Sequence, residues 1–402
     1  MNKVEKYIES NWGKCVRVRT EDEGDLIGLP YPYVVPSLEA FDELYYWDTY
    51  FTNKGLEIAG RFELAKNNVD DMLFLVEKYG YMPNGSRTHY LGKSQPPFLS
   101  EMVRDVYENF KDVNWLEGAY KTLEKEYTFW MTERITPIGL NKYSIKEKDI
   151  DHYQGFLDRI QYVPEGTKDE IENHYLSECE SGWDCNPRFD FEIFNFAPVD
   201  LNSLLYMLEK NMEYFSSVLK NDRENEWKEK AETRKGLMKK YLCTEDGLWL
   251  DYNFKTEKHS KVFSVASYYP MFAKMLDKNE TEELVKNMYR VEAKHGFVAC
   301  GEHNVPGNYQ WDAPNGWACL QYIMIKSLDN YGYKEDALRV AEKYTKLVEK
   351  VYDETGALWE KYNVVEGNIN VTGEFPDWKM PSMMGWSAGA YLYASKYINE
   401  NK

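Results

Sequence analysis

Apolar residues recur at helical spacing along most of the chain. Between positions 61 and 79 they fall on one face of a helix, and Gly80 follows as a helix-ending residue. With 41–59, a segment after Gln95-Pro96-Pro97 and the N-terminal segment, about twelve helices are expected. The remaining segments with this spacing are 112–133, 200–219, 223–241, 262–276, 282–291, 315–328, 334–352 and 384–397.

Signals for β-strands are short and weak by comparison. Residues 247–252 and 357–362 resemble each other, since each carries Leu-Trp followed by an acidic residue near a tyrosine. We interpret both as short β-hairpin segments that follow helices. The longest irregular stretch covers 135–165, and loops of this length often line or cover functional sites.

The predicted fold is all-α, an (α/α)6 barrel: a closed toroid of about six helix pairs. Short β-hairpins and long loops would then surround a central pocket. No linker or composition shift divides the chain, so residues 1–402 are predicted to form a single catalytic domain. An open α-solenoid is the alternative, although no fixed-period repeat is present.

Composition and charge narrow the possible partners. The net charge of −18 disfavours nucleic acid and anionic membranes, which both require a basic surface. Aromatic residues make up 16% of the chain, with 33 Tyr and 12 Trp. Such side chains suit the apolar faces of sugar rings as well as core packing, so the composition fits a small saccharide ligand.

Cysteine and histidine usage gives no sign of a metal or cofactor. The six cysteines are scattered without a CxxC pair, and the six histidines form no HExxH motif. No EF-hand motif is present, although a structural calcium ion is left open. A charged segment follows Met1 and no apolar run reaches transmembrane length. We therefore expect a cytoplasmic protein, monomeric or a small homo-oligomer, that needs no cofactor.

Residues 180–189 contain the strongest candidate for catalysis, Asp184. Asn186-Pro187 disfavours helix, which places Asp184 on a loop. The neighbouring Trp183 would help to desolvate the carboxyl group and raise its pKa, as a general acid at neutral pH requires. Alternatively, Asp184 caps a helix or pairs with Arg188.

Three other stretches have similar chemistry at predicted helix entrances or in loops. Each combines aromatic residues or amides with charged groups, the mixture that carbohydrate sites use to bind ring faces and hydroxyl groups. The stretches are 41–50 with Trp47 and Asp48, 83–98 with Asn84, Arg87 and Gln95, and 310–317 with Trp311 and Asp312.

These motifs resemble the trehalase family, glycoside hydrolase family 37, and more loosely family 63. The resemblance covers residues 36 to about 390, and its motifs occur in the family's order. It implies an (α/α)6 barrel and an inverting α-glycosidase. The matching words are Tyr45-Tyr46-Trp47-Asp48, Pro83-Asn84-Gly85, Ser94-Gln95-Pro96-Pro97, Glu180-Ser181-Gly182-Trp183-Asp184, Ala197-Pro198-Val199-Asp200-Leu201-Asn202 and Gln310-Trp311-Asp312 with Pro314-Asn315-Gly316-Trp317-Ala318.

The resemblance also implies roles for individual residues. Asp184 matches the general acid and Glu360, in Trp359-Glu360-Lys361-Tyr362, matches the general base, with Glu374 as the rival base. In an inverting enzyme the two carboxyl groups are about 6.5–9.5 Å apart. Expected sugar-binding residues are Trp47, Asp48, Asn84, Arg87, Gln95, Arg159, Trp183, Arg188, Trp311, Asp312 and Glu374.

The chain departs from the family around the expected leaving group. Ala40 stands where the family has a substrate-binding arginine, and Lys93 where arginine is common. The arginine-rich word before the acid is missing, and Arg159 is a candidate substitute. The expected function is hydrolysis of trehalose or another small α-glucoside by an inverting exo-α-glycosidase. The alternatives are a family 63-like hydrolase of α-glucosyl or α-mannosyl glycerate or of a short α-linked oligosaccharide, and a non-catalytic sugar-binding protein.

Overall fold

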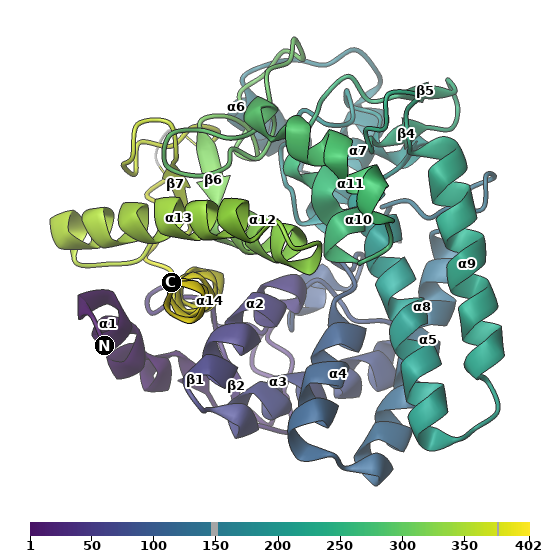
Figure 1. Ribbon diagram of the computed structural model, residues 1–402, viewed down its shortest axis with the longest axis vertical. Coiled ribbons are helices and arrows are strands. Elements are labelled where there is room, and N and C mark those ends of the chain that lie inside the picture. The colour runs from purple at the N-terminus through teal and green to yellow at the C-terminus, as the bar shows by residue number, and fades with distance from the viewer. Residues whose placement is uncertain (146–151, 376–377) are drawn as a thin grey trace.

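Helices dominate the computed structural model, which describes residues 1–145, 152–375 and 378–402 (Figure 1). Within these ranges, the α-helices are α1 Lys3–Asn11, α2 Tyr46–Ile58, α3 Phe62–Tyr79, α4 Leu99–Phe110, α5 Val113–Glu133, α6 Tyr153–Ile160, α7 Lys168–Ser181, α8 Val199–Leu219, α9 Glu224–Tyr241, α10 Tyr269–Phe272, α11 Lys278–Lys286, α12 Ala318–Asn330, α13 Lys334–Thr355 and α14 Gly385–Asn401.

Six of these helices form a closed inner ring. In order around the ring they are α2, α4, α8, α10, α12 and α14; each packs against the next, and α14 returns to α2 (Figure 1). The helices α1, α3, α5, α9, α11 and α13 alternate with them along the chain. Helix α3 packs on α2 and α4, α5 on α4 and α8, and α13 on α12 and α14. The predicted (α/α)6 barrel is therefore confirmed.

The inner and outer helices differ in how much of their surface is buried. In the inner helix α8 most side chains are buried, and polar residues such as Asp200, Asn202 and Glu209 are buried with them. The next helix along the chain, α9, buries only one stripe, Trp227, Ala231, Arg234 and Met238. An apolar stripe on a polar helix is typical of a helix that covers a core from outside.

The strands are short and tie loops together. They are β1 Val16–Arg17, β2 Tyr33–Val34, β3 Phe196–Ala197, β4 Tyr252–Asn253, β5 Lys258–His259, β6 Asn315–Trp317 and β7 Lys361–Asn363. Strands β6 and β7 pair antiparallel, with Trp317 directly opposite Lys361. This pairing joins the chain next to Trp311 to the chain next to Glu360, which are far apart in sequence.

The helix predicted for 41–59 begins only at Tyr46, and two other predicted helices differ more strongly in the structure. Residues 262–276 form only a 3-10 turn, Val265–Tyr268, and the single helical turn of α10. The chain then leaves the helix through Lys274, whose φ of 53° lies in the left-handed region. Helix α11 begins before the predicted residue 282, because Asp277 and Glu280 form a capping box at its start.

The prediction for the segment that precedes Asp184 also needs correction. Helix α6 falls inside the stretch 135–165 that was expected to be irregular, and α7 was not predicted. A Thr167–Glu170 capping box starts α7, a signal that is readable in the sequence. Part of this stretch, 146–151, lies outside the described residues.

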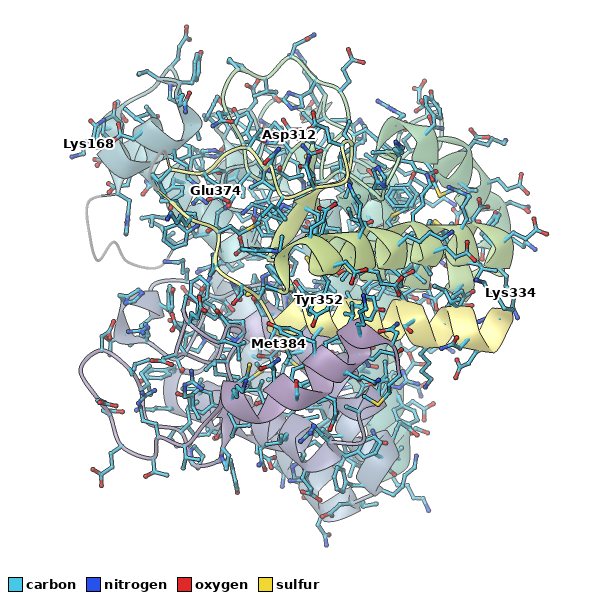
Figure 2. The ribbon with its side chains drawn as sticks, turned by 90° about the vertical axis from the view of Figure 1, so that its left-hand side faces the viewer. Lys168, Asp312, Lys334, Tyr352, Glu374 and Met384 are labelled. Carbon is cyan, nitrogen blue, oxygen red and sulfur yellow. The ribbon has the colours of Figure 1, made fainter. Side chains whose placement is uncertain are left out.

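The loops that lead into the inner helices gather at one end of the ring. Asp48, Gln95, Asp184, Trp311 and Glu360 all lie in these connections or in the first turn of an inner helix. In Figure 2 the loops that carry Asp312 and Glu374 lie in the upper part of the molecule, and Lys334, at the start of α13, lies at its right-hand edge. Because the inner helices run in the same direction, their entry loops bring distant residues together.

Candidate active site

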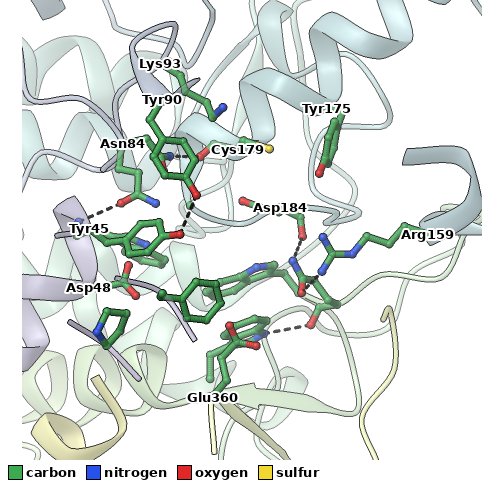
Figure 3. A pocket seen from close by; sticks show the side chains of 18 of the residues that line it. Tyr45, Asp48, Asn84, Tyr90, Lys93, Arg159, Tyr175, Cys179, Asp184 and Glu360 are labelled. Carbon is green, nitrogen blue, oxygen red and sulfur yellow. Dashed lines mark hydrogen bonds between the residues drawn. The ribbon is translucent and has the colours of Figure 1, made fainter. Parts of the chain in front are cut away.

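A cavity of about 410 Å³ opens where these loops meet (Figure 3). Nine of the thirteen residues predicted from the sequence line it, and they come from six separate segments of the chain. These nine are Trp47, Asp48, Asn84, Gln95, Arg159, Asp184, Trp311, Glu360 and Glu374.

Asp184 is delivered to the cavity by a tightly held loop. Helix α7 ends at Ser181, and Gly182 caps it in the left-handed conformation, with a φ of 72°. The buried carboxylate of Glu178 then accepts hydrogen bonds from the backbone N–H groups of Cys185 and Asn186. The Gln310 amide donates to the backbone carbonyl of Asp184 at 2.9 Å. Asp184 therefore lies on a loop, as predicted, and its backbone is fixed from both sides.

The electrostatic surroundings of Asp184 suit a general acid. Burial raises the pKa of its carboxyl group, and the nearby Glu360 carboxylate raises it further. The charges of Arg159 and Lys93 act in the opposite direction. A carboxyl group with a raised pKa retains its proton closer to neutral pH, where a leaving oxygen needs it.

Glu360 faces the same cavity from another side. It precedes β7, and its Oε2 accepts a hydrogen bond from Lys361 Nζ at 2.8 Å. The Trp386 indole donates to its backbone carbonyl at 3.2 Å. In Figure 3, Asp184 and Glu360 approach the cavity from opposite sides, as an acid and a base on the two faces of a sugar would.

Asp48 is a third carboxyl group of the cavity, in the first turn of α2. Burial raises its pKa to about 8, and the charges of Glu360 and Asp184 add to this effect. Asp48 is therefore largely protonated at neutral pH. In this form its carboxyl group both donates and accepts hydrogen bonds, which suits a sugar hydroxyl group.

Two amide side chains complete the polar wall near Asp48. Gln95 accepts a hydrogen bond from the backbone N–H of Trp47 at 3.2 Å. Asn84 donates to the backbone carbonyls of Ser94 and Cys179. Both side chains are almost fully buried, so they are held in fixed orientations at the cavity.

Tryptophans from separate segments form the floor of the cavity. The ring of Trp311 stacks on Trp317 with 3.8 Å between ring centroids and on Trp183 with 5.1 Å. Trp47 lies 5.6 Å away on another side, and Trp386 meets Trp311 edge to face at 6.3 Å. Of these rings, those of Trp47, Trp311, Trp317 and Trp386 line the cavity with apolar surface, against which the C–H groups of a sugar ring can pack.

Arg159 reaches the cavity from α6 and joins three segments there. It donates to the Gln310 side chain at 2.5 Å and to the Gly373 carbonyl at 3.1 Å. Its guanidinium lies 5.0 Å from the ring centroid of Phe375 and 3.7 Å from Glu374. A cation is thus present in the cavity although the arginine-rich family word is missing from the sequence.

Arg188 and Trp183 do not line the cavity, although both were expected to contact the sugar. Arg188 is fully buried and pairs with Asp200 and Asp251 through four hydrogen bonds of 2.9–3.0 Å. Trp183 is fully buried between Trp311 and the Arg188 guanidinium. Both residues therefore pack behind the loop that carries Asp184. Arg188 pairs with Asp200 and Asp251 and not with Asp184.

Arg87 and Asp312 are also engaged away from the cavity lining. Arg87 forms ion pairs with Asp25 at 2.6 Å and Glu43 at 3.1 Å. Asp312 lies 2.8 Å from the imidazole of His303. Neither side chain lines the cavity, so their contact with the sugar remains a prediction.

Several lining residues were not predicted. Tyr45, Gly182, Gln310 and Trp317 belong to recognised motifs, so the motifs were a usable signal for them. Most of the others lie outside these motifs, and the folding of the chain brings them to the cavity. They include His89, Tyr90, His152, Tyr175, Cys179, Phe375, Trp378, Met383 and Trp386.

The described parts of the chain contain neither a candidate metal site nor a helix that could span a membrane. Across residues 1–145, 152–375 and 378–402, no group of three or more His, Cys, Asp or Glu side chains could hold a metal ion. In the same ranges, every helix is too short or too polar to cross a membrane.

A closed (α/α)6 ring with paired carboxyl groups over a tryptophan floor defines a carbohydrate-processing enzyme. The model of the trehalase family matches residues 1–399, and the chain belongs to this family of glycoside hydrolases. It is 30% identical to a periplasmic trehalase of Escherichia coli O1:K1, covering 97% of this chain and 73% of that protein. A periplasmic trehalase of Xanthomonas oryzae pv. oryzae is 29% identical, with 97% and 72% covered.

Solved structures agree with this assignment. The neutral trehalase of Saccharomyces cerevisiae superimposes with a TM-score of 0.80 at 28% identity, covering 99% of this chain and 80% of that one. A family 63 mannosylglycerate hydrolase of Thermus thermophilus gives a TM-score of 0.64 at 17% identity, with 90% and 95% covered. The second similarity concerns the fold.

Proposed function

We propose that this chain is an inverting α-glycosidase that hydrolyses trehalose, with Asp184 as general acid and Glu360 as general base. The observation that carries the proposal is the placement of these two carboxyl groups on opposite sides of one cavity with a tryptophan floor (Figure 3). Membership of the trehalase family and the similarity to the yeast neutral trehalase support the substrate. We further propose that residues 1–402 act as one catalytic domain.

The reaction follows from the two carboxyl groups. Asp184 gives its proton to the glycosidic oxygen as the bond to the anomeric carbon breaks. Glu360 takes a proton from a water molecule, and the water oxygen attacks the anomeric carbon from the opposite face. One glucose leaves with inverted configuration and the other with its original configuration, and the proton taken by Glu360 replaces the one lost by Asp184.

Glu360 suits the role of base better than Glu374. Glu360 lines the same cavity as Asp48 and Asp184, and its charge raises the pKa of both of these carboxyl groups. Glu374 is held by Lys361 and lies 3.7 Å from Arg159. Glu374 is therefore engaged by two cations, whereas the ion pair of Glu360 among the described residues is with Lys361.

The remaining polar groups have positions that suit the sugar rings. Asp48, Asn84 and Gln95 are almost fully buried in the cavity wall. We propose that they bind the glucose unit whose anomeric carbon the water attacks. Arg159 lies beside Phe375. We propose that Arg159 binds the leaving glucose and so replaces the family arginine that is Ala40 in this chain.

The test is glucose release from a substrate panel, followed by proton NMR of the first products. The panel is trehalose, kojibiose, nigerose, maltose, isomaltose, glucosylglycerate and mannosylglycerate, with Asp184→Asn as blank. Trehalose should be cleaved fastest, and fresh products should contain α- and β-glucose in equal amounts. Products that are all α-glucose would contradict inversion, and faster cleavage of a glycerate would contradict the substrate. Binding without turnover by the wild type would make the chain a sugar-binding protein.

Location and assembly remain separate proposals. The cytoplasmic location expected from the sequence remains a prediction, because the curated relatives described above are named as periplasmic trehalases. The monomeric or small homo-oligomeric state also remains a prediction, which size-exclusion chromatography with light scattering can test.

A further inference from the structure

Lys361 is a fully buried lysine beside the proposed base. The exposed fraction of its side chain is 0%, yet its ammonium group binds two carboxylates of the cavity. It donates to Glu360 Oε2 at 2.8 Å and forms an ion pair with Glu374 Oε1. Taking an ammonium group out of water is unfavourable unless charged partners compensate for the loss, and both of its partners belong to the candidate active site.

The backbone around Lys361 fixes where its ammonium group lies. Lys361 begins strand β7 and stands opposite Trp317 of β6 in the antiparallel pair. Its Nζ lies 4.3 Å from the ring centroid of Trp317, and Trp317 itself stacks on Trp311 in the cavity floor. Strand pairing and the indole face together hold the ammonium group between the two carboxylates.

Several charged groups surround Lys361 and the proposed base. Three other acidic groups face Glu360 or its partners: Asp48 from α2, Asp184 from the loop after α7, and Glu374 from the loop before α14. In the part of the chain that the structure describes, the lysine and the arginine that line the cavity are Lys93, from the loop before α4, and Arg159, from α6. Among the described residues, Lys361 is the cation in ion-pair contact with both Glu360 and Glu374.

We propose that Lys361 is the positioning residue of the general base: it ties Glu360 to Glu374 and holds the Glu360 carboxylate in place. This inference rests on the proposed function, in which Glu360 activates the water. Lys361 would act through Glu360 rather than on the sugar, because Glu360 and Glu374 line the cavity and Lys361 does not.

Two substitutions should move the pH profile of kcat/KM in opposite directions. In Lys361→Met the carboxylates lose their shared cation, so the acidic limb should move up by about one pH unit. The value of kcat should fall about 10- to 100-fold with little change in KM, because the base is no longer held in place. In Glu374→Gln the Lys361 ammonium group binds Glu360 alone, so the acidic limb should move to lower pH while kcat stays substantial.

The experiment compares these variants with Lys361→Arg and with Lys54→Met. Arginine keeps the positive charge and should restore part of the wild-type profile. Lys54 is a matched control, since it is a largely buried lysine of α2 that pairs with Asp105 of α4 and does not line the cavity. Its loss should lower the melting temperature and leave the pH profile unchanged.

The outcomes separate this inference from the proposed function. If the wild type cleaves no α-glucoside, the proposed function is wrong. If the wild type is active but Lys361→Met keeps the wild-type profile, the inference is wrong and Lys361 is structural. Should Lys361→Met fail to fold, Glu374→Gln decides: a downward shift supports the inference, and an unchanged profile or abolished turnover overturns it.

Discussion

Gly182 packs directly against the indole of Trp47. A β-carbon at position 182 would stand 2.7 Å from Trp47 Cε2, closer than real carbon atoms approach one another. Gly182 also has a φ of 72°, in the left-handed region that favours glycine. Two motifs that are far apart in the sequence therefore meet at a single close contact, and this contact sets the path of the chain into Asp184.

Substitution of Gly182 by alanine should disturb both stability and catalysis. Left-handed strain and overpacking against Trp47 each cost about 1–3 kcal/mol, and the displaced loop carries the general acid. We expect a lower melting temperature and at least a tenfold loss of kcat. Gly80 is the matched control, since it also caps a helix with positive φ but has no atoms near an added β-carbon. Gly80→Ala should carry the left-handed strain alone, so it should destabilise the fold less than Gly182→Ala and spare kcat; equal losses of kcat in both would contradict the role of the Trp47 contact.

The role of Asp184 can be separated from that of Glu360 with α-glucosyl fluoride. Fluoride leaves without protonation, so the general acid matters less for this substrate. Asp184→Asn should lose about 100- to 10,000-fold in kcat on trehalose but retain much of its activity on the fluoride. Glu360→Gln should lose activity on both, because both reactions need an activated water. Reversal of this pattern would exchange the two roles.

The raised pKa of Asp48 predicts a pH-dependent stability. Its pKa is raised from 3.8 to about 8 in the folded protein, so folding takes up a proton over this range. The stabilisation is complete below pH 4 and is lost as the pH rises towards 8. The free energy of unfolding of the wild type relative to Asp48→Asn should therefore fall between pH 4 and 8, by on the order of 3–5 kcal/mol. Urea denaturation at several pH values measures it.

Asp71 provides a control for this measurement. Burial also raises its pKa to about 8, and it accepts a hydrogen bond from the backbone N–H of Tyr31 rather than facing the cavity. Asp71→Asn should show the same pH trend in stability with unchanged KM. A flat difference between wild type and Asp48→Asn would mean that Asp48 is ionised in the folded protein.

Most of the fold could be predicted from the sequence because helical periodicity is a local property. Long helices such as α5 and α13 carry a clear apolar stripe, and their ends fell within two or three residues of the prediction. Residues 262–276 have an apolar pattern as well, but there the chain buries nearly every side chain in irregular turns. Periodicity alone does not distinguish a buried turn from a buried helix.

Site residues could be predicted from the sequence where they belong to a motif. They could not be predicted where only the folding of the chain brings them to the cavity. Asp184, Trp311 and Glu360 come from recognisable words and line the cavity together. Arg188 lies in such a word too, yet it binds Asp200 and Asp251, because its five N–H donors find two buried carboxylates behind the loop. A single sequence shows that a residue is present in a motif, but it does not show which way the side chain points.

Arg159 gives the sharpest test of how this chain compensates for Ala40. Its guanidinium contacts Gln310, Gly373 and Phe375 at the cavity, where we place the leaving glucose. Arg159→Met should raise KM for trehalose at least tenfold, since a hydrogen bond to a charged group is worth about 1.5–3 kcal/mol. KM for α-glucosyl fluoride, which has no second sugar, should change much less. Equal increases for both substrates would show that Arg159 shapes the whole cavity, and the leaving glucose would then have to be bound by other groups.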